Sequence, residues 1–386
     1  MSSRILITTE PRDVHAIAVA LGLARLGQEA SLWYGADLPL ALSTSFRLSD
    51  DMPVSWRASG PDLAFADPQF DTVWYRRHNV PFVGDRVHPE DRDFADKELR
   101  LFDRAVWTQI ARDAFWVNPV AQFDVANSKL RQLTIARAAG FAIPDTLMSN
   151  DPAAIRRFVG EKATDGVVYK TFFPSRWELA DGGRAFLPTT EIAADALPED
   201  DVLRLTPGIF QAKVPKAYEI RVTVMGRECV AARIESQKSE SARGDWRFDL
   251  DGSVTLAAMT LPEETREKCL GVMRDLGIVF GCFDLIVTPA GETVFLEVNE
   301  MGQFLWVETA LPHYPLLDMF CRFLIEARAD FRYRPGADPL AFHGIQQDPD
   351  YEAALARSES QHVNRRRPQP VPESAAAGKD RESQPR

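Results

Sequence analysis

Apolar residues follow two different periods along the chain. An apolar strand at residues 4–9, an amphipathic helix at 13–26 and a second strand at 29–34 follow one another near the amino terminus. Strands with a two-residue period dominate after Val167, and a helical period at 263–276 interrupts them. The pattern predicts an α/β opening built on a βαβ unit, followed by an α+β region of antiparallel strands with helices laid against them.

Further elements are predicted between and after these. FDTVWYRR, at 70–77, has the apolar run of a strand, and residues 90–114 and 314–329 have helical periods. In NSKLRQLTIARAAG, Ser128 has the side chain of a helix N-cap, and Gly140 is a helix stop signal. A helix is therefore expected between these two residues.

The stretch FDLIVTPAGETVFLEVNE, residues 283–300, predicts a β-hairpin, because two alternating runs flank a four-residue loop. If Thr288 pairs with Thr293, Asp284 lies directly opposite Glu297. The face shared by these two carboxylates would also carry Cys282, Ile286, Phe295 and Asn299. Directly opposed Cβ atoms lie about 4.5–5.5 Å apart, and two like charges at that distance destabilise a sheet.

A divalent cation between the two carboxylates would account for the pair, since carboxylate oxygens are its preferred ligands. Asn299, two residues after Glu297, adds a carbonyl oxygen. Three oxygen ligands leave most of an octahedral shell open, which is how Mg²⁺ is held when the phosphates of a nucleotide complete the shell. The alternative is a solvated acidic face, and the apolar neighbours on that face argue against it.

Cations are expected where phosphates bind. Lys170 lies in the apolar strand VVYKTFF, where an ammonium is costly to bury without an anion. Arg221, in EIRVTV, shares a face with Glu219 opposite the apolar face of that strand. Each residue alone is equally compatible with the edge of an ordinary strand, from which long side chains reach water. Together with the acidic pair they favour a nucleotide site.

Composition limits the other possibilities. The 386 residues are 45% hydrophobic, which is enough for two or three domains, and the formal net charge of -11 disfavours general affinity for nucleic acid or anionic membranes. The four cysteines lack metal-ligand spacing, so reduced, packed thiols are expected. The sequence contains no GxxxxGK[ST], HRD, DFG, GxSxG or HExxH motif. It also contains no signal peptide and no apolar run of about 18 residues, so a cytoplasmic protein is expected.

The blocks NSKLRQL, VVYKTF, IFQAKV, EIRVTVMG, DWRF, FDLIV and FLEVNEMGQFLWVE resemble, in this order, the blocks of the ATP-grasp ligases. WYRR, GFAIPDTLMSND and NEMGQFLWVE make the chain most similar to the maturases of microviridin-type peptides, the graspetides, within that superfamily. The resemblance covers about residues 1–330. It implies an α/β domain and two α+β lobes that enclose ATP.

Four segments are expected from this resemblance. They are a pre-ATP-grasp domain at 1–117, an N-terminal lobe at 118–205, a C-terminal lobe with the metal site at 206–330, and an extension at 331–386. The last residues, from about 357, lack aromatic side chains and are rich in Pro, Ser, Ala and charge, so we expect them to be disordered.

The resemblance also implies the roles of individual residues in binding ATP. Lys129 and Lys170 would contact the phosphates, and Arg221 the phosphates or an acyl-phosphate. Glu219 would bind the ribose hydroxyls. The hinge whose backbone reads the adenine would be Gln211, Ala212, Lys213 and Val214, and the ligands of Mg²⁺ would be Asp284, Glu297 and Asn299.

Two positions depart from the pattern of the family. Ala212 stands where an acidic hinge residue is usual, a change that a backbone contact tolerates. The best candidate for the glycine-rich loop over the phosphates, Asp181-Gly182-Gly183, lies at an unusual distance from Lys170.

Cationic and aromatic residues are expected to guide the substrate. Arg247, in GDWRFD, is the candidate beside the substrate carboxylate, with an ordinary surface arginine as the alternative. Arg76 and Arg77 are candidates from the first domain, with the same alternative. Gln303 and Trp306 would line the path of a peptide beyond the metal.

The resemblance implies that an Asp or Glu carboxylate of a ribosomal precursor peptide is activated by ATP as an acyl-phosphate. A Ser or Thr hydroxyl, or a Lys amine, of the same peptide then displaces phosphate and closes a ring. Arg221, Lys170 and Arg247 would be the catalytic residues, and a homodimer is expected. The alternatives are a glutamate-adding or small-molecule carboxylate-amine ligase of the same fold, and a non-catalytic ATP-binding regulatory protein.

Overall fold

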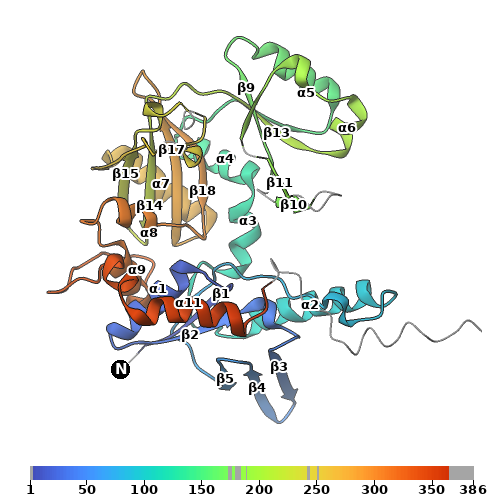
Figure 1. Cartoon of the computed structure of the whole chain (residues 1–386), viewed down its shortest axis with the longest axis vertical. Helices are drawn as coiled ribbons and strands as arrows, with labels where there is room; N and C mark the ends of the chain where they lie inside the picture. The colour runs from blue at the N-terminus through green and yellow to red at the C-terminus, as the bar shows by residue number, and fades with distance from the viewer. Residues whose placement is uncertain are drawn as a thin grey trace, which may run out of the picture. The chain divides into compact units, whose positions relative to one another are not determined.

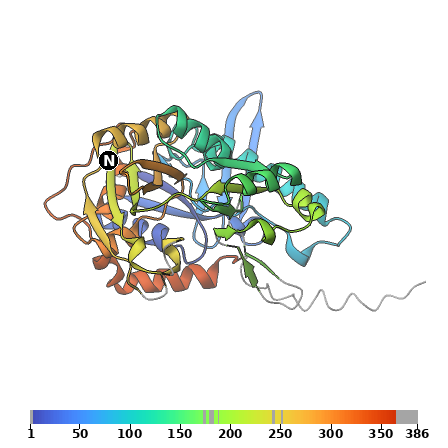
Figure 2. The same cartoon turned by 90° about the horizontal axis from the view of Figure 1, so that it is seen from above.

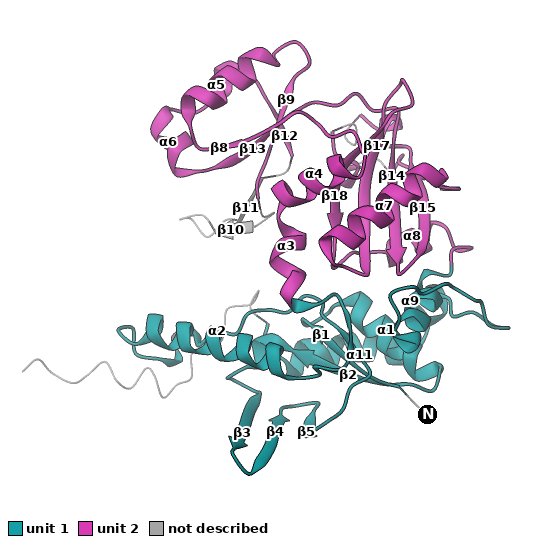
Figure 3. Cartoon of the chain, turned by 180° about the vertical axis from the view of Figure 1, so that it is seen from behind, with its two compact units in different colours: residues 1–120, 315–386 teal, residues 121–314 magenta. Residues whose placement is uncertain are grey.

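The computed structural model describes residues 3–172, 176–178, 184–187, 189–240, 244–249 and 252–364. The chain divides into two compact units, one of residues 1–120 and 315–386 and one of residues 121–314 (Figure 3). We expected the first boundary at residue 117. Residues 315–330, which we assigned to the C-terminal lobe, belong to unit 1.

Unit 1 is built on a parallel sheet of four strands in the order β2-β1-β6-β7. Its strands are β1 (Arg4–Thr9), β2 (Glu29–Tyr34), β6 (Thr72–Trp74) and β7 (Phe115–Val117). Helix α1 (Val14–Arg25) connects β1 to β2, which confirms the predicted βαβ opening. The strand predicted at 70–77 is shorter than expected, and α2 (Arg92–Gln109) ends before β7 begins.

Unit 1 also contains an antiparallel sheet that the sequence analysis did not predict. Its strands are β3 (Ser43–Ser49), β4 (Met52–Ser59) and β5 (Ala64–Ala66). Trp56 and Ala58 of β4 join the hydrophobic core of the parallel sheet, where they are buried with Trp33, Val73 and Trp107. Burial of these side chains is what attaches the small sheet to the larger one.

The C-terminal segment of the chain returns to unit 1. Its helices are α9 (Leu316–Glu326), α10 (Phe342–Gln346) and α11 (Pro349–Gln361), and all three pack against α1 (Figures 1 and 2). Helix α11 continues past residue 357, where we expected disorder to begin. His362 follows it and is bound by Asp37 and Asp62, at 2.6 Å and 2.8 Å. Residues 365–386 lie outside the described part of the chain.

Unit 2 contains a four-stranded antiparallel sheet in the order β12-β9-β13-β8. Its strands are β8 (Thr146–Ser149), β9 (Val167–Lys170), β12 (Thr190–Ile192) and β13 (Gly208–Ala212). Helices α5 (Pro152–Glu161) and α6 (Asp200–Leu205) pack on this sheet through Ile155, Val159 and Leu203. A short antiparallel pair, β10 (Arg176–Glu178) and β11 (Arg184–Phe186), lies between β9 and β12 in the chain. The candidate loop Asp181-Gly182-Gly183 lies outside the described residues.

The second sheet of unit 2 has five antiparallel strands in the order β16-β15-β14-β17-β18. They are β14 (Tyr218–Met225), β15 (Glu228–Ile234), β16 (Leu256–Met259), β17 (Phe280–Val287) and β18 (Thr293–Asn299). The helices around it are α3 (Phe123–Asn127), α4 (Lys129–Ala138), α7 (Glu263–Leu276) and α8 (Leu305–Ala310). One core joins α4 and α7 to one face of the sheet, with Val222, Phe283 and Val272 fully buried in it.

The predicted hairpin is β17 and β18, and its register differs from the expected one near the turn. Val287, not Thr288, pairs with Thr293. A β-bulge at Leu296 inserts one residue, so that Asp284 nevertheless lies opposite Glu297, as predicted. The bulge also changes the faces: Phe295 is buried in the core with α4 and α7 and does not share the face of the carboxylates.

Two smaller predictions also hold. Ser128 is the N-cap of α4, where its hydroxyl accepts a hydrogen bond from the N–H of Arg131 at 3.3 Å. Gly140 follows this helix with φ of 87°, a conformation that favours glycine. Among the described residues, no helix is long and apolar enough to cross a membrane.

Candidate active site

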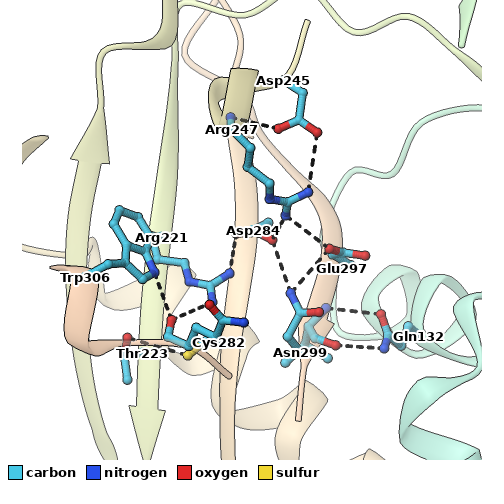
Figure 4. A network of polar contacts seen from close by, with 12 residues as sticks. Gln132, Arg221, Thr223, Asp245, Arg247, Cys282, Asp284, Glu297, Asn299 and Trp306 are labelled. Carbon is cyan, nitrogen blue, oxygen red and sulfur yellow. Dashed lines mark hydrogen bonds and ion pairs between the residues drawn. The ribbon is translucent and has the colours of Figure 1, made fainter. Parts of the chain in front are cut away.

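Asp284 and Glu297 face each other on the side of the five-stranded sheet away from α4 and α7 (Figure 4). Asn299 belongs to the same group, because its amide nitrogen lies 3.3 Å from Asp284 Oδ2 and 3.3 Å from Glu297 Oε1. The strands therefore bring together the three side chains that the hairpin pattern predicted as a group.

The negative charge of this pair is compensated by basic side chains. Arg221 donates to Asp284 Oδ1 from Nη1 at 2.7 Å. Lys129, the first residue of α4, forms an ion pair with Glu297. One nitrogen of Arg247, Nη2, lies 3.2 Å from Asp284 Oδ2 and 3.7 Å from Glu297 Oε1. The like-charge repulsion inferred from the strand register is thus offset by cations from three other elements.

Electrostatics keep Glu297 ionised. Burial by itself would raise the pKa of this carboxyl, but Lys129, Arg247 and Lys170 together hold the pKa well below its usual range. For the pKa of Lys170, burial outweighs the neighbouring charges. Removal from water lowers the pKa of its ammonium, and Glu297 opposes this only in part. The site therefore favours an additional anion beside Lys170.

Gln132 fixes the position of β18, and the sequence analysis did not identify it. Its side-chain amide donates to the carbonyl of Val298 at 2.8 Å and accepts from the N–H of Val298 at 3.1 Å, as a neighbouring strand would (Figure 4). A third hydrogen bond goes to the carbonyl of Ala126. Val298 lies between Glu297 and Asn299, so this contact holds the edge strand that carries both side chains.

The backbone of Gln303 and the ring of Trp306 hold Arg221 and the segment that carries Arg247 in place. The carbonyl oxygen of Gln303 accepts from Arg221 Nη2 at 2.9 Å and from Trp306 Nε1 at 3.0 Å. The ring of Trp306 stacks on that of Trp246, with centroids 4.6 Å apart. Arg247 follows Trp246, and the backbone N–H of Arg247 donates to the carboxylate of Asp245 at 3.1 Å. These contacts involve the backbone of Gln303, and its predicted place along the peptide path stays a prediction.

The predicted adenine hinge lies at the end of β13. The N–H groups of Ala212 and Lys213 donate to carbonyls of Asp145 and Gly166, each at 2.9 Å. The next hinge N–H in the chain is that of Val214, which is therefore the donor we expect a base to meet. Gln211 is buried, and its amide donates to the hydroxyl of Thr146 at 3.0 Å.

Glu219, the predicted ribose ligand, lies on β14, two residues before Arg221 on the same face. Burial raises the pKa of its carboxyl, and the ammonium of Lys216, 3.0 Å away, opposes that rise. The roles of these residues in nucleotide binding remain predictions.

The ligand set fits Mg²⁺. Arg247 Nη2 shows that one cationic atom can lie within 4 Å of both carboxylates. Rotation of the Asn299 amide about its Cβ–Cγ bond would turn a carbonyl oxygen toward the same point. This candidate set contains two carboxylates and one amide; among the described residues, no group of three or more His, Cys, Asp or Glu side chains is placed to hold a metal.

Arg76 does not have the position expected for a substrate residue. Its side chain is 0% exposed in unit 1, where Nε donates to Asp13 at 2.8 Å and the guanidinium lies over the ring of Trp74. A guanidinium that is fully buried and paired in this way is not exposed to contact a substrate. Arg77 is partly exposed and forms an ion pair with Glu10 at 2.6 Å, also within unit 1.

Comparison with known proteins identifies the fold. No family model matches the chain. Two curated relatives, both described as probable alpha-L-glutamate ligases, come from Psychromonas ingrahamii and Chromohalobacter salexigens. The first is 24% identical over 242 residues, which are 62% of this chain and 75% of the relative. The second is 23% identical over 239 residues, which are 61% of this chain and 76% of the relative.

Solved structures match a larger part of the chain. A Chryseobacterium gregarium RiPP-associated ATP-grasp ligase, solved with ADP and a leader and core peptide, has a TM-score of 0.75 and 28% identity and covers 86% of this chain and 100% of its own. Macrocyclase MdnC from Microcystis aeruginosa, bound to precursor peptide MdnA, has a TM-score of 0.72 and 26% identity, with 84% and 99% covered. Macrocyclase MdnB from the same organism has a TM-score of 0.70 and 27% identity, also with 84% and 99% covered. The chain therefore has the fold of the ATP-grasp ligases and is similar to RiPP-associated members of that superfamily.

Proposed function

We propose that the chain is an ATP-dependent macrocyclase of a ribosomally made precursor peptide. It activates Asp or Glu side-chain carboxylates of the peptide and joins them to Ser or Thr hydroxyls as esters, or to Lys amines as amides. One observation carries the proposal: the compensated carboxylate pair, Asp284 and Glu297, occurs in a fold that matches a ligase solved with ADP, leader and core peptide along 86% of this chain.

The first step is phosphoryl transfer. A carboxylate oxygen of the peptide bonds to the γ-phosphorus of ATP, the bond from that phosphorus to the β–γ bridging oxygen breaks, and ADP leaves with the electron pair. Such a transfer depends on position and on charge neutralisation, which Lys170 and Arg221 provide in this proposal. Mg²⁺ held by Asp284, Glu297 and Asn299 would neutralise further charge on the phosphate oxygens when bound.

The second step closes the ring. The hydroxyl or amine attacks the acyl carbon and gives up its proton, and the bond from that carbon to the phosphate oxygen breaks. Over both steps the peptide loses one water per crosslink, while ATP becomes ADP and phosphate. Arg247 is half-exposed beside the stacked rings of Trp246 and Trp306, which supports a role for this segment next to the peptide. Holding the two reacting groups adjacent favours closure.

Mass spectrometry tests this function. The protein is incubated with ATP, Mg²⁺ and a precursor rich in Thr or Ser and in Asp or Glu, chosen from the coding sequence beside its own gene. We expect successive losses of one water, each accompanied by one ADP. A precursor that stays at its starting mass while ATP is consumed by another acceptor would refute the macrocyclase.

A second candidate is a ligase that adds glutamate to an acceptor, because both curated relatives are described as probable alpha-L-glutamate ligases. The same measurement separates the two, since added amino acids raise the mass of the acceptor. A regulatory protein without turnover would bind ATP and release no ADP. The expected homodimer stays a prediction, which the molar mass from light scattering would test.

A further inference from the structure

Arg247 lies at the point that a metal ion would need. Its Nη2 atom lies 3.2 Å from Asp284 Oδ2 and 3.7 Å from Glu297 Oε1, so a single cationic nitrogen contacts both predicted metal ligands (Figure 4). A metal ion held by Asp284 and Glu297 would draw on the carboxylates that Arg247 contacts. The guanidinium and the ion therefore cannot both hold this position.

The other two cations that form ion pairs with these carboxylates are placed differently. The side chain of Arg221 is only 6% exposed and is held on its far side by the carbonyl of Gln303. Lys129 contacts Glu297 alone and belongs to α4, which Gln132 joins to β18. Arg247 is 51% exposed, and a single short 3₁₀ turn, Trp246–Phe248, carries it. Of the three, Arg247 has the most exposed side chain and is therefore the one that can move most easily.

We propose that Arg247 is an exchangeable counter-cation: it neutralises Asp284 and Glu297 before the metal binds, and the arriving divalent ion displaces it toward the anionic substrate. This inference rests on the proposed function and adds a sequence of events to it. Metal binding would precede the presentation of Arg247 to a substrate carboxylate.

Two contacts would keep the released side chain beside the site. Asp245 lies 3.4 Å from Nη1 of Arg247, and the ring of Trp246 lies 5.8 Å from its guanidinium carbon. Neither contact involves a metal ligand, so both can persist after the exchange. The displaced guanidinium has then lost two carboxylate partners and retains one, which favours a new anion such as the carboxylate of a peptide.

The exchange is tested without ATP and without peptide. Mn²⁺, which takes the same oxygen ligands, is titrated into the full chain while electron paramagnetic resonance reports the free ion. We expect Arg247→Gln to bind Mn²⁺ about tenfold more tightly, because two partly exposed ion pairs no longer compete with the metal. Arg233→Gln is the matched control, since Arg233 contacts the ring of Tyr218 and Glu235 and neither metal ligand.

A second measurement separates movement from simple loss of charge. In the unmodified protein, Mn²⁺ should speed amide hydrogen exchange in residues 244–249, because the carboxylates no longer hold that segment. Equal Mn²⁺ affinity in Arg247→Gln and the unmodified protein would refute competition. Tighter binding without a change of exchange in residues 244–249 would refute displacement, because charge acting through space would suffice. Both results are independent of whether a peptide is cyclised, so they cannot be confused with failure of the proposed function.

Discussion

The contact between Gln132 and Val298 leads to a sharp prediction about the position of the metal ligands. Gln132 is 1% exposed, and its amide satisfies both backbone groups of Val298 on the outer edge of β18. Gln132→Leu keeps the size and the apolar packing of the side chain but removes every hydrogen bond. The N–H and C=O of Val298 would then be buried without partners.

The expected magnitude follows from the two groups left unpaired. A buried polar group without a partner costs about 1–3 kcal/mol, so the edge of β18 should lose about 2–6 kcal/mol of local stability. Even the lower end corresponds to about thirtyfold faster opening. We therefore expect amide hydrogen exchange at Val298 to accelerate by at least that factor. Metal affinity and ATP turnover should fall with it, because Glu297 and Asn299 flank the freed residue.

Thr134→Ala is the matched control. Thr134 lies on the same helix, is exposed, and donates its hydroxyl hydrogen to Leu130 of its own helix. It should leave exchange at Val298 and metal binding unchanged. If Gln132→Leu also left Val298 exchange at the unmodified rate, the side chain would not be what holds the edge strand, and the argument would be wrong.

Two further predictions concern buried charges. Glu297→Gln leaves Lys129 and Arg247 without their shared carboxylate. We expect ATP turnover to be lost, and urea unfolding to show a free energy of unfolding lower by about 1–3 kcal/mol. Unchanged turnover would rule out Glu297 as a metal ligand. In unit 1, burial would raise the pKa of Asp13, but Arg76 and Arg77 lower it to about 2. Because the pKa of Asp13 is lower in the folded than in the unfolded protein, its ionised carboxylate stabilises the fold at pH values above the unfolded pKa of about 3.9. Up to about 2.6 kcal/mol of the free energy of unfolding should therefore be lost as the pH falls from 5 toward 2. Asp13→Asn should weaken this acid dependence in urea unfolding measured across that range, and an unchanged pH dependence would contradict it.

The hairpin illustrates what local pattern can predict. Alternation placed Asp284 opposite Glu297, and that pairing is correct. The predicted register is nevertheless wrong near the turn, where the pairing is displaced by one residue. The bulge at Leu296 compensates for that displacement, so the pairing of Asp284 with Glu297 is kept. The run of three consecutive apolar residues, Val294 to Leu296, is the trace that the bulge leaves in the sequence. Alternation across them fails, and for that reason Phe295 was assigned to the wrong face.

The residues missed or misplaced depend on partners far away in the chain. Gln132 looks like a solvent-facing position of a helix, and only the packing of α4 beside β18, 166 residues later, reveals its role. Arg76 looked like a surface cation because Asp13, its partner, is 63 residues away. Polar residues with buried partners cannot be told from exposed ones by the period of apolar residues alone. Ser128 was predicted correctly because a helix cap is a local feature.

The distribution of charge in the site explains why local pattern found the acidic half first. Asp284 and Glu297 come from one hairpin, whereas Lys129, Lys170, Arg221 and Arg247 come from four separate elements. Lys129, Arg221 and Arg247 form ion pairs with the two carboxylates. In the proposed function, a divalent ion would take the carboxylates and leave these basic residues to neutralise a polyphosphate. Neither set of charges would then be unpaired, whereas metal alone or nucleotide alone would leave one of them without partners. We therefore expect metal and nucleotide to bind better together than either one does alone.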